Sequence, residues 1–180
     1  AAPQEVAEML ASYFTHAVEA IFSAGGTLDK FIGECVMAFF GAPVPQSDHA
    51  RRAVQAAIQI QEAQEALNRE RAARGLPTLL VRIAIQSGPV MVGDVGSRKR
   101  VDYTVLGNTV NVAARLESGV AEAGEITLGG ETHRLLAGAF PTEPLGEFQL
   151  KGLQQKVHAF RVLRVGARAH PGARAAALRH

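Results

Sequence analysis

Apolar residues near the start of the chain recur every three or four positions, the period of a helix that buries one face. Gly25 and Gly26 follow this pattern and predict where the helix ends. The next stretch, 27–41, is short and apolar and is divided by Gly33, so it predicts a β-hairpin. The helical positions expected to face inward are Val6, Met9, Leu10, Tyr13, Phe14, Ala17, Val18, Ile21 and Phe22.

A second helical pattern follows Pro45. Ser47 or Asp48 can cap this helix, which we expect to run to about Arg74. Residues 79–88 then alternate between apolar and polar and predict a strand, with 89–97 as its returning partner. The inward side chains expected on the second helix are Ala53, Val54, Ala57, Ile58 and Leu67.

The rest of the chain alternates short strands with short helices. The predicted strands are 101–107, 124–130, 147–152 and 156–163. The predicted helices are 108–120, which opens on Asn108, and 131–139. This order predicts an α+β fold, a ferredoxin-like sandwich with a largely antiparallel sheet, helices on one face and a small C-terminal αβ extension.

Composition places the chain among ordinary globular proteins. The length of 180 residues suits one domain with a buried core, with 47% apolar and 20% charged residues. The single cysteine, Cys35, excludes a disulfide framework and fits a reducing compartment. No signal peptide is visible, and no apolar run approaches the ~20 residues of a membrane span. We therefore expect a cytoplasmic domain.

The C-terminal end of the chain is basic. Residues 148–180 hold seven Lys/Arg and no Asp/Glu, although the net charge of the whole chain is only +2. Such a segment can touch nucleic acid or a membrane surface. However, 164–180 contains Gly, Pro and Ala without a firm apolar period, and no aromatic residues alternate with its arginines. We interpret 164–180 as a basic tail or linker and expect no nucleic-acid partner.

Asn111 and Arg115 are the most telling polar pair. They are four residues apart on a predicted helix, so both lie on one face about one turn apart. Arg115 is a planar cation suited to phosphate oxygens. From these residues alone a structural role is favoured, in which Arg115 pairs with Glu117 or an acidic surface and Asn111 is an ordinary residue of the helix face.

Three longer motifs change this interpretation. GGTLDKFIGECVMAFFGAP at 25–43, VRIAIQSGPVMVGDVG at 81–96 and GSRKRVDYTVLGNTVNVAARLE at 96–117 follow one another along the chain. Together they resemble the catalytic domain of class III nucleotidyl cyclases, the adenylate and guanylate cyclases. They are most similar to the bacterial, bicarbonate-responsive adenylate cyclases that carry threonine at a base-reading position. The resemblance assigns 1–163 to this catalytic domain.

The resemblance implies an adenylate cyclase that converts ATP to 3′,5′-cyclic AMP and pyrophosphate. In this family the ribose 3′-hydroxyl attacks the α-phosphorus of the same nucleotide, and two divalent ions, Mg²⁺ or Mn²⁺, assist. The active site forms between two catalytic domains. ATP as substrate, a homodimer, bicarbonate regulation and fusion to regulatory domains are implied in the same way.

The resemblance also implies roles for individual side chains. Lys30 and Thr104 match the positions that read the base, and lysine argues for ATP because guanylate cyclases typically carry glutamate there. Asn111 matches the residue that orients the ribose, and Arg115 the one that stabilises charge on the α-phosphate. Lys151 matches a lysine that contacts the terminal phosphates. The structural alternatives are a solubilising strand-edge charge for Lys30, a strand-forming residue for Thr104 and a strand-end cation for Lys151.

The sequence departs from the family at its metal ligands. Glu34 stands where the second of two metal-binding aspartates is expected, and its side chain is one methylene longer. We expect the first aspartate on a strand before Ala1. Two hypotheses therefore stay open: an adenylate cyclase whose activity is reduced by Glu34, and an inactive cyclase-like module for dimerisation or nucleotide binding in a larger signalling protein. A diguanylate cyclase is set aside because its GGDEF-type signature is absent.

Overall fold

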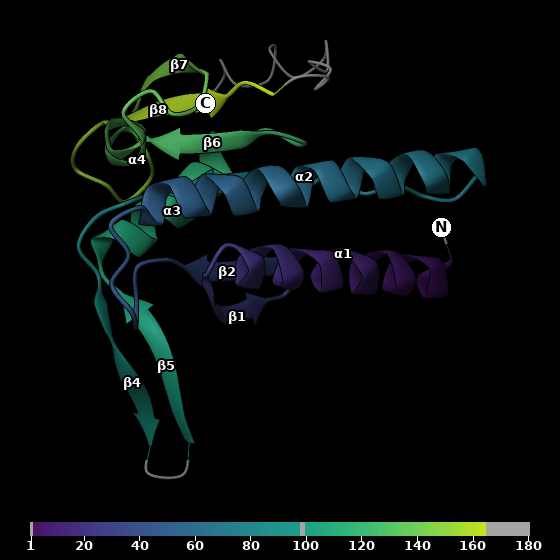
Figure 1. Ribbon diagram of the computed structural model, residues 1–180, viewed down its shortest axis with the longest axis horizontal. Helices are drawn as coiled ribbons and strands as arrows, with labels where there is room; N and C mark the ends of the chain where they lie inside the picture. The colour runs from purple at the N-terminus through teal and green to yellow at the C-terminus, as the bar shows by residue number, and fades with distance from the viewer. Residues whose placement is uncertain (1, 98–99, 165–180) are drawn as a thin grey trace. The chain divides into compact units, whose positions relative to one another are not determined.

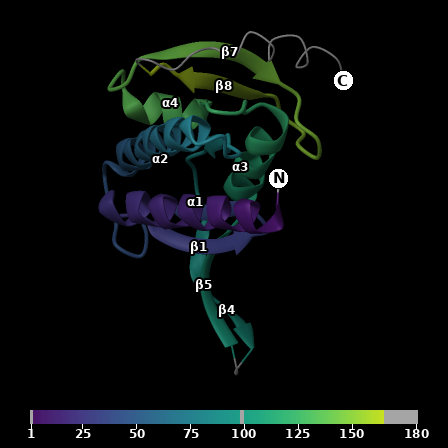
Figure 2. The same ribbon diagram turned by 90° about the vertical axis from the view of Figure 1, so that its right-hand side faces the viewer.

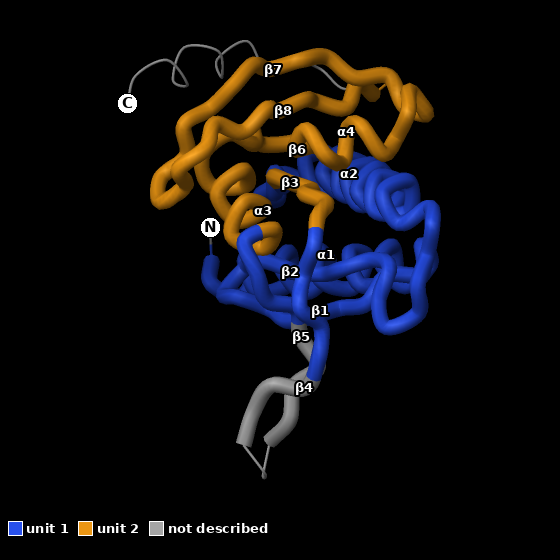
Figure 3. Tube along the Cα trace, turned by 90° about the vertical axis from the view of Figure 1, so that its left-hand side faces the viewer, with its two compact units in different colours: residues 1–81, 89–108 blue, residues 82–88, 109–180 orange. Residues whose placement is uncertain are grey.

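The structure is a computed structural model that describes residues 2–97 and 100–164, with the side chains of 94–97 and 100–104 left out (Figure 1). Residues 165–180 of the expected basic tail lie outside the described part. The chain divides into two compact units, coloured separately in Figure 3. The first unit comprises Ala1–Val81 and Pro89–Asn108, and the second comprises Arg82–Gly88 and Thr109–His180.

Two long helices form the body of the first unit, α1 (Pro3–Ser23) and α2 (His49–Ala73). They lie side by side and antiparallel, because His16 bonds Gln64 while Ala24, further along α1, bonds Arg52 near the start of α2 (Figure 1). Four of the nine predicted inward residues of α1 are buried, four are half-buried, and Phe22 in the last turn is exposed. Ala20 is buried although it was not predicted. The buried residues of this helix are Met9, Tyr13, Ala17, Ala20 and Ile21.

The buried face of α2 differs from the prediction. Val54 and Ala57 are buried as expected, but Ala53, Ile58 and Leu67 are only half-buried. Their place on the inward face is taken partly by polar side chains. The buried polar residues of α2 are Gln61, Gln64 and Arg71.

Gln61 and Arg71, together with the half-buried Asn68, bind the backbone of 77–81, which follows α2 in the chain. The bonds run from Gln61 Nε2 to Val81 O at 2.8 Å, from Asn68 Nδ2 to Leu79 O at 2.7 Å and from Arg71 Nε to Pro77 O at 2.6 Å. The Leu79 N–H also donates to Asn68 Oδ1 at 3.1 Å. Alternate carbonyls of the segment are thereby satisfied, and these hydrogen bonds offset the cost of burying the polar side chains.

Two β-hairpins complete the first unit. Strands β1 (Thr27–Ile32) and β2 (Cys35–Phe39) pair antiparallel, as predicted for 27–41. Strands β4 (Met91–Ser97) and β5 (Arg100–Leu106) also pair antiparallel, with Met91 opposite Leu106. The predicted pairing of 89–97 with 79–88 is wrong, because β4 forms its ladder with β5.

The second unit contains a four-stranded sheet in the order β3–β6–β8–β7. Its strands are β3 (Ile83–Ile85), β6 (Ile126–Gly129), β7 (Thr142–Phe148) and β8 (Val157–Val162). β3 and β6 are parallel, and the other pairs are antiparallel. The predicted strand 79–88 is thus reduced to three residues, because the segment before it bonds side chains of α2. The second strand of the predicted final pair, 156–163, is confirmed as β8, but its partner β7 ends at Phe148, so the prediction of a strand over 147–152 is wrong beyond its first two residues.

Helices α3 (Asn108–Gly119) and α4 (Gly130–Leu136) pack against this sheet. Val112 and Leu116 of α3 pack on Ala159 of β8 to form the core of the unit. Phe160, the next residue of β8, points to the opposite face. There its ring stacks on His133 of α4, with 3.7 Å between the ring centroids. No helix in the described part of the chain combines the length and the apolar character that crossing a membrane requires.

Candidate active site

The β1–β2 hairpin carries two of the predicted site residues. Its turn is Gly33-Glu34, between the paired residues Ile32 and Cys35, and Gly33 has φ +59°. A positive φ at the first turn position suits glycine and matches the twist of a two-residue hairpin. Glu34 is therefore placed at the tip of the hairpin, where its side chain is exposed.

Lys30 lies on β1 directly after a bulge. Leu28 pairs with Ala38 and Lys30 with Met37, so Asp29 is the extra residue of this strand. Bulges of this kind re-aim the side chains that follow them and occur often beside active sites. The bulge therefore sets the direction in which Lys30 points.

The next residue shows which face Lys30 occupies. β1 runs alongside α1 (Figure 2), and the Phe31 ring meets the Phe14 ring of α1 edge to face at 5.0 Å. Because neighbouring residues of a strand point to opposite faces, Lys30 points away from α1. Neither the Lys30 nor the Glu34 side chain forms a hydrogen bond or ion pair with another described residue, and both side chains are exposed. A cation and an anion on this hairpin are thus free to bind a ligand.

Thr104 belongs to the same unit. It lies on β5 opposite Gly93, and β5 lies beside β1. Its side chain falls outside the described part of the structure, so its predicted contact with the base stays a prediction.

Asn111 and Arg115 share the exposed face of α3. The helix begins at Asn108, as predicted, and buries Val112 and Leu116 on its other side. The alternative pairing of Arg115 with Glu117 is not formed, because Glu117 pairs with Arg82 at 3.3 Å. Neither Asn111 nor Arg115 bonds another described residue through its side chain. The amide and the guanidinium are therefore both available on one helix face.

Lys151 lies in the turn that follows β7. It stands between Leu150, which is buried in the core beside α3, and Gly152, whose φ is +80°. The Lys151 side chain is exposed. Leu150 anchors the turn, so the backbone of Lys151 is fixed while its ammonium group reaches solvent.

Glu34 supplies part of what a metal site requires. Its carboxylate is a hard oxygen ligand of the kind that Mg²⁺ and Mn²⁺ prefer. Among the described residues, however, no three His, Cys, Asp or Glu side chains gather into a cluster that could hold an ion. The residues present therefore fit one ligand of a divalent site, and further ligands must come from elsewhere.

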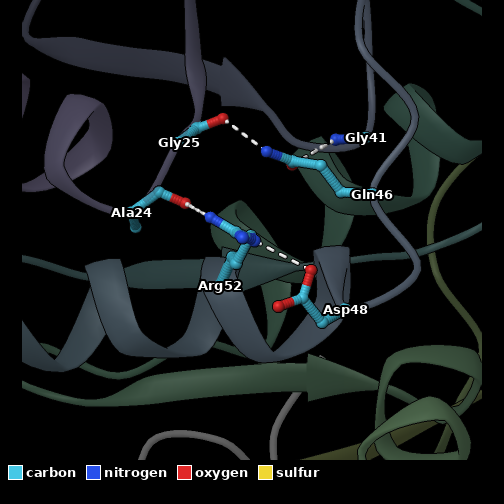
Figure 4. A network of polar contacts seen from close by, with 6 residues as sticks. All are labelled: Ala24, Gly25, Gly41, Gln46, Asp48 and Arg52. Carbon is cyan, nitrogen blue, oxygen red and sulfur yellow. Dashed lines mark hydrogen bonds and ion pairs between the residues drawn. The ribbon is translucent and has the colours of Figure 1, made fainter.

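No role was predicted for Gln46, whose side chain lies at the base of the hairpin (Figure 4). It follows the prolines that end the hairpin, where polar residues are commonplace. The only signal was indirect: glycines stand at 25 and 41, the two positions that its side chain bonds.

The chain combines an α+β fold with an exposed lysine on a hairpin and an exposed Asn–Arg pair on a helix. The family model for the adenylate and guanylate cyclase catalytic domain matches residues 1–163. The chain belongs to this family.

Individual relatives agree with this assignment. Adenylate cyclase 1 of Rhizobium meliloti is 35% identical over 164 residues, which cover 91% of this chain and 25% of that protein. The chain thus spans about a quarter of the length of this relative. The adenylyl cyclase CyaB from P. aeruginosa is 32% identical, with a TM-score of 0.82 over 91% of this chain and 85% of that one.

Solved guanylate cyclases are also similar. The guanylate cyclase domain of RhGC from Catenaria anguillulae, in complex with GTP, has 28% identity and a TM-score of 0.79. The match covers 91% of this chain and 86% of that one. The predicted α+β cyclase fold is therefore confirmed, and the fold is shared by enzymes named for either nucleotide.

Proposed function

We propose that this domain is an adenylate cyclase that converts ATP to 3′,5′-cyclic AMP and pyrophosphate. The observation that carries the proposal is the β1–β2 hairpin, which presents Lys30 and Glu34, both exposed and unpaired among the described residues, in a chain of the cyclase family. Unpaired charges on a rigid hairpin gain no folding stability from each other. Ligand binding accounts for their presence there.

The substrate is assigned to ATP from Lys30. Its ammonium group has only donors, which suit the acceptor N1 of adenine and not the N1–H donor of guanine. Thr104, with a hydroxyl that both donates and accepts, is the second base-reading residue. The relative named adenylate cyclase 1 supports this choice.

The chemical step joins the ribose 3′-oxygen to the α-phosphorus and breaks the bond from the α-phosphorus to the β-phosphate bridging oxygen. The 3′-hydroxyl loses its proton and pyrophosphate leaves. Asn111 holds the ribose so that its hydroxyl is in line, which is a positioning effect. Arg115 stabilises the negative charge that builds on the α-phosphate oxygens, and Lys151 binds the terminal phosphates.

Divalent metal ions complete the site. Bound there, Mg²⁺ or Mn²⁺ would acidify the 3′-hydroxyl and neutralise the triphosphate. Glu34 would be one protein ligand, and the aspartate that the family resemblance implies would be the other. In the described part of the chain β3 is the terminal strand of its sheet, so its outer edge is a place where a further strand can pair.

The active enzyme is a homodimer in which one copy provides Glu34 and the upstream aspartate and the other provides Lys30, Thr104, Asn111 and Arg115. Closed two-fold pairing of this kind yields two equivalent sites. Regulation by bicarbonate, fusion to regulatory domains and a cytoplasmic location belong to the same proposal.

Glu34 also favours a second candidate, an inactive cyclase-like module. A glutamate reaches about 1.5 Å further than an aspartate, and metal-assisted catalysis tolerates little displacement. Such a module would bind ATP or dimerise without turnover.

One experiment decides between them. A protein that includes the residues upstream of Ala1 is supplied with ATP or GTP and Mg²⁺ or Mn²⁺, and cyclic nucleotide is measured. Cyclic AMP in excess of cyclic GMP supports the adenylate cyclase. ATP binding without product, even with Mn²⁺, supports the inactive module, and preferential use of GTP contradicts the assignment of Lys30.

A further inference from the structure

The two ends of the β1–β2 hairpin meet at a single side chain. The Gly41 N–H, just after β2, donates to Gln46 Oε1 at 3.0 Å. Gln46 Nε2 in turn donates to Gly25 O, just before β1, at 3.1 Å. Figure 4 shows the carboxamide lying between the two glycines. The amide thus joins the start and the end of the hairpin through one acceptor and one donor.

The backbone conformation of the two glycines allows this contact. Gly25 has φ +77° and Gly41 has φ +89°, which a residue with a side chain rarely adopts. A Cβ atom at Gly25 would stand only 2.9 Å from Gln46 Nε2 and 2.9 Å from Arg52 Nη1. The backbone at 25 therefore approaches both side chains as closely as only glycine allows.

Arg52 provides a second brace at the same end. Its Nη1 donates to Ala24 O at 3.2 Å, and its Nε donates to Asp48 Oδ1 at 2.8 Å (Figure 4). The bond from Arg52 holds the pKa of the Asp48 carboxyl below its ordinary value of 3.8, so this pair is charged at neutral pH. Arg52 therefore bonds the backbone at the end of α1, whereas Gln46 connects the residue before β1 with the residue after β2.

We propose that Gln46 is a positioning residue that fixes the direction of the hairpin and thereby the discrimination between ATP and GTP by Lys30. This role rests on the proposed cyclase function. Gln46 touches neither Lys30 nor Glu34. It acts on them through the two strands that it joins.

A small tilt at the ends of the hairpin changes the position of Lys30. Lys30 is three residues from Thr27, where β1 begins, about 10 Å along the strand. A tilt of about 5° at the end of the hairpin would displace Lys30 by about 0.9 Å over this length. A displacement of about 1 Å can lower a catalytic rate about 100-fold. Because the Thr27–Ala42 bond at 3.0 Å and the strand ladder would remain, we expect a smaller effect, about tenfold in kcat/KM for ATP.

The test uses the full-length protein with Gln46→Met, which keeps the length of the side chain and removes both hydrogen bonds. Gln46→Glu keeps the acceptor for Gly41 and loses the donor for Gly25. Gln55→Met is the matched control, because Gln55 is an exposed residue of α2 that bonds no described residue through its side chain. Amide hydrogen exchange of the hairpin and kcat/KM for ATP and for GTP are measured for each protein.

Gln46→Met is expected to speed amide exchange at Gly41 and along β1 about fivefold to tenfold, the effect of losing about one net hydrogen bond. It is also expected to lower the ratio of kcat/KM for ATP to that for GTP at least about fivefold. Gln46→Glu should give a smaller change in both, and Gln55→Met none. A simple loss of folded protein would lower both activities equally and leave the ratio unchanged.

An unchanged ratio in Gln46→Met overturns the positioning role, whatever happens to the absolute rates or to exchange. If the unaltered protein binds nucleotide without turnover, the ratio of dissociation constants for ATP and GTP replaces that of kcat/KM and decides in the same way. If the unaltered protein neither binds nor converts either nucleotide, the proposed function fails, and the role of Gln46 fails with it.

Discussion

Replacing Lys30 by glutamate is expected to invert the base preference of the enzyme. A carboxylate accepts from the N1–H and 2-amino groups of guanine, whereas the ammonium of Lys30 donates to N1 of adenine. One well-placed base contact is worth about 1–3 kcal/mol of discrimination. The ratio of kcat/KM for ATP to that for GTP should therefore fall about 5- to 150-fold from the lost contact alone.

The same substitution should leave the fold intact. Lys30 is exposed and forms no ion pair with another described residue, and its cross-strand neighbour is the uncharged Met37. A surface substitution of this kind changes the free energy of unfolding by no more than about 0.5 kcal/mol. The urea midpoint should thus be unchanged, so a change in activity cannot be attributed to unfolding.

Two further variants separate the possible causes. Lys30→Met removes the donor without adding a negative charge near Glu34, and it should lower activity with ATP without raising activity with GTP. Lys156→Glu makes the same charge change at an exposed lysine in the second unit and should leave the ratio as it is. If neither Lys30 variant changes the ATP-to-GTP ratio by more than twofold, Lys30 does not read the base.

Three other outcomes are expected. Glu34→Asp should raise the Mg²⁺-dependent rate of cyclic AMP formation about tenfold, because a shorter carboxylate restores the expected ligand position; a lower rate would show that the site is adapted to glutamate. Arg115→Lys should lower kcat about 100- to 1,000-fold with an unchanged urea midpoint, because the exposed guanidinium acts on the transition state alone; retained turnover would remove Arg115 from the mechanism. Asn68→Ala should lower the free energy of unfolding by about 2–4 kcal/mol, because it leaves the Leu79 N–H and C=O and the buried Gln64 amide without their hydrogen-bond partner. A loss below about 1 kcal/mol in urea unfolding would contradict this.

The parts of the fold that follow from local chemistry were predictable. The helical period of α1 predicted the centre of its buried face, Met9, Tyr13, Ala17 and Ile21, because the apolar residues of this helix pack on α2 and on the β1–β2 hairpin beside it. The β1–β2 hairpin followed from Gly33, since a turn with positive φ needs only the residues beside it. In both cases the sequence signal and the structural cause lie within a few residues of each other.

Long-range pairing was not predictable in the same way. A prediction from the helical spacing of apolar residues places glutamine on the exposed face, yet Gln61 and Gln64 are buried. Gln61 is 1% exposed and donates to the carbonyl of Val81, twenty residues away. The predicted partner of β3 was wrong for a related reason. β3 pairs in parallel with β6, about forty residues further along the chain, and not with β4, the next strand in the sequence.

Some residues of the candidate site could be predicted from the sequence, and others could not. The roles of Lys30, Glu34 and Arg115 came from resemblance, and the structure adds that these side chains are exposed and bond no other described residue. The role of Gln46 had only an indirect signal in the sequence, the glycines at 25 and 41, because it depends on the two backbone groups that the side chain bonds. One of them belongs to Gly41, five residues away, and the other to Gly25, 21 residues away.

The choice of nucleotide cannot come from the fold. Adenylyl and guanylyl cyclases match this chain with nearly equal structural similarity, so the backbone that they share carries no information about the base. The difference must lie in a few side chains and in how firmly they are held. Under the proposed function those side chains are Lys30 and Thr104, on neighbouring strands of one unit, and the Gln46 amide joins the ends of the hairpin that carries Lys30. We therefore expect a single substitution on β1 to change the preferred nucleotide, provided that the contacts at the ends of the hairpin are kept.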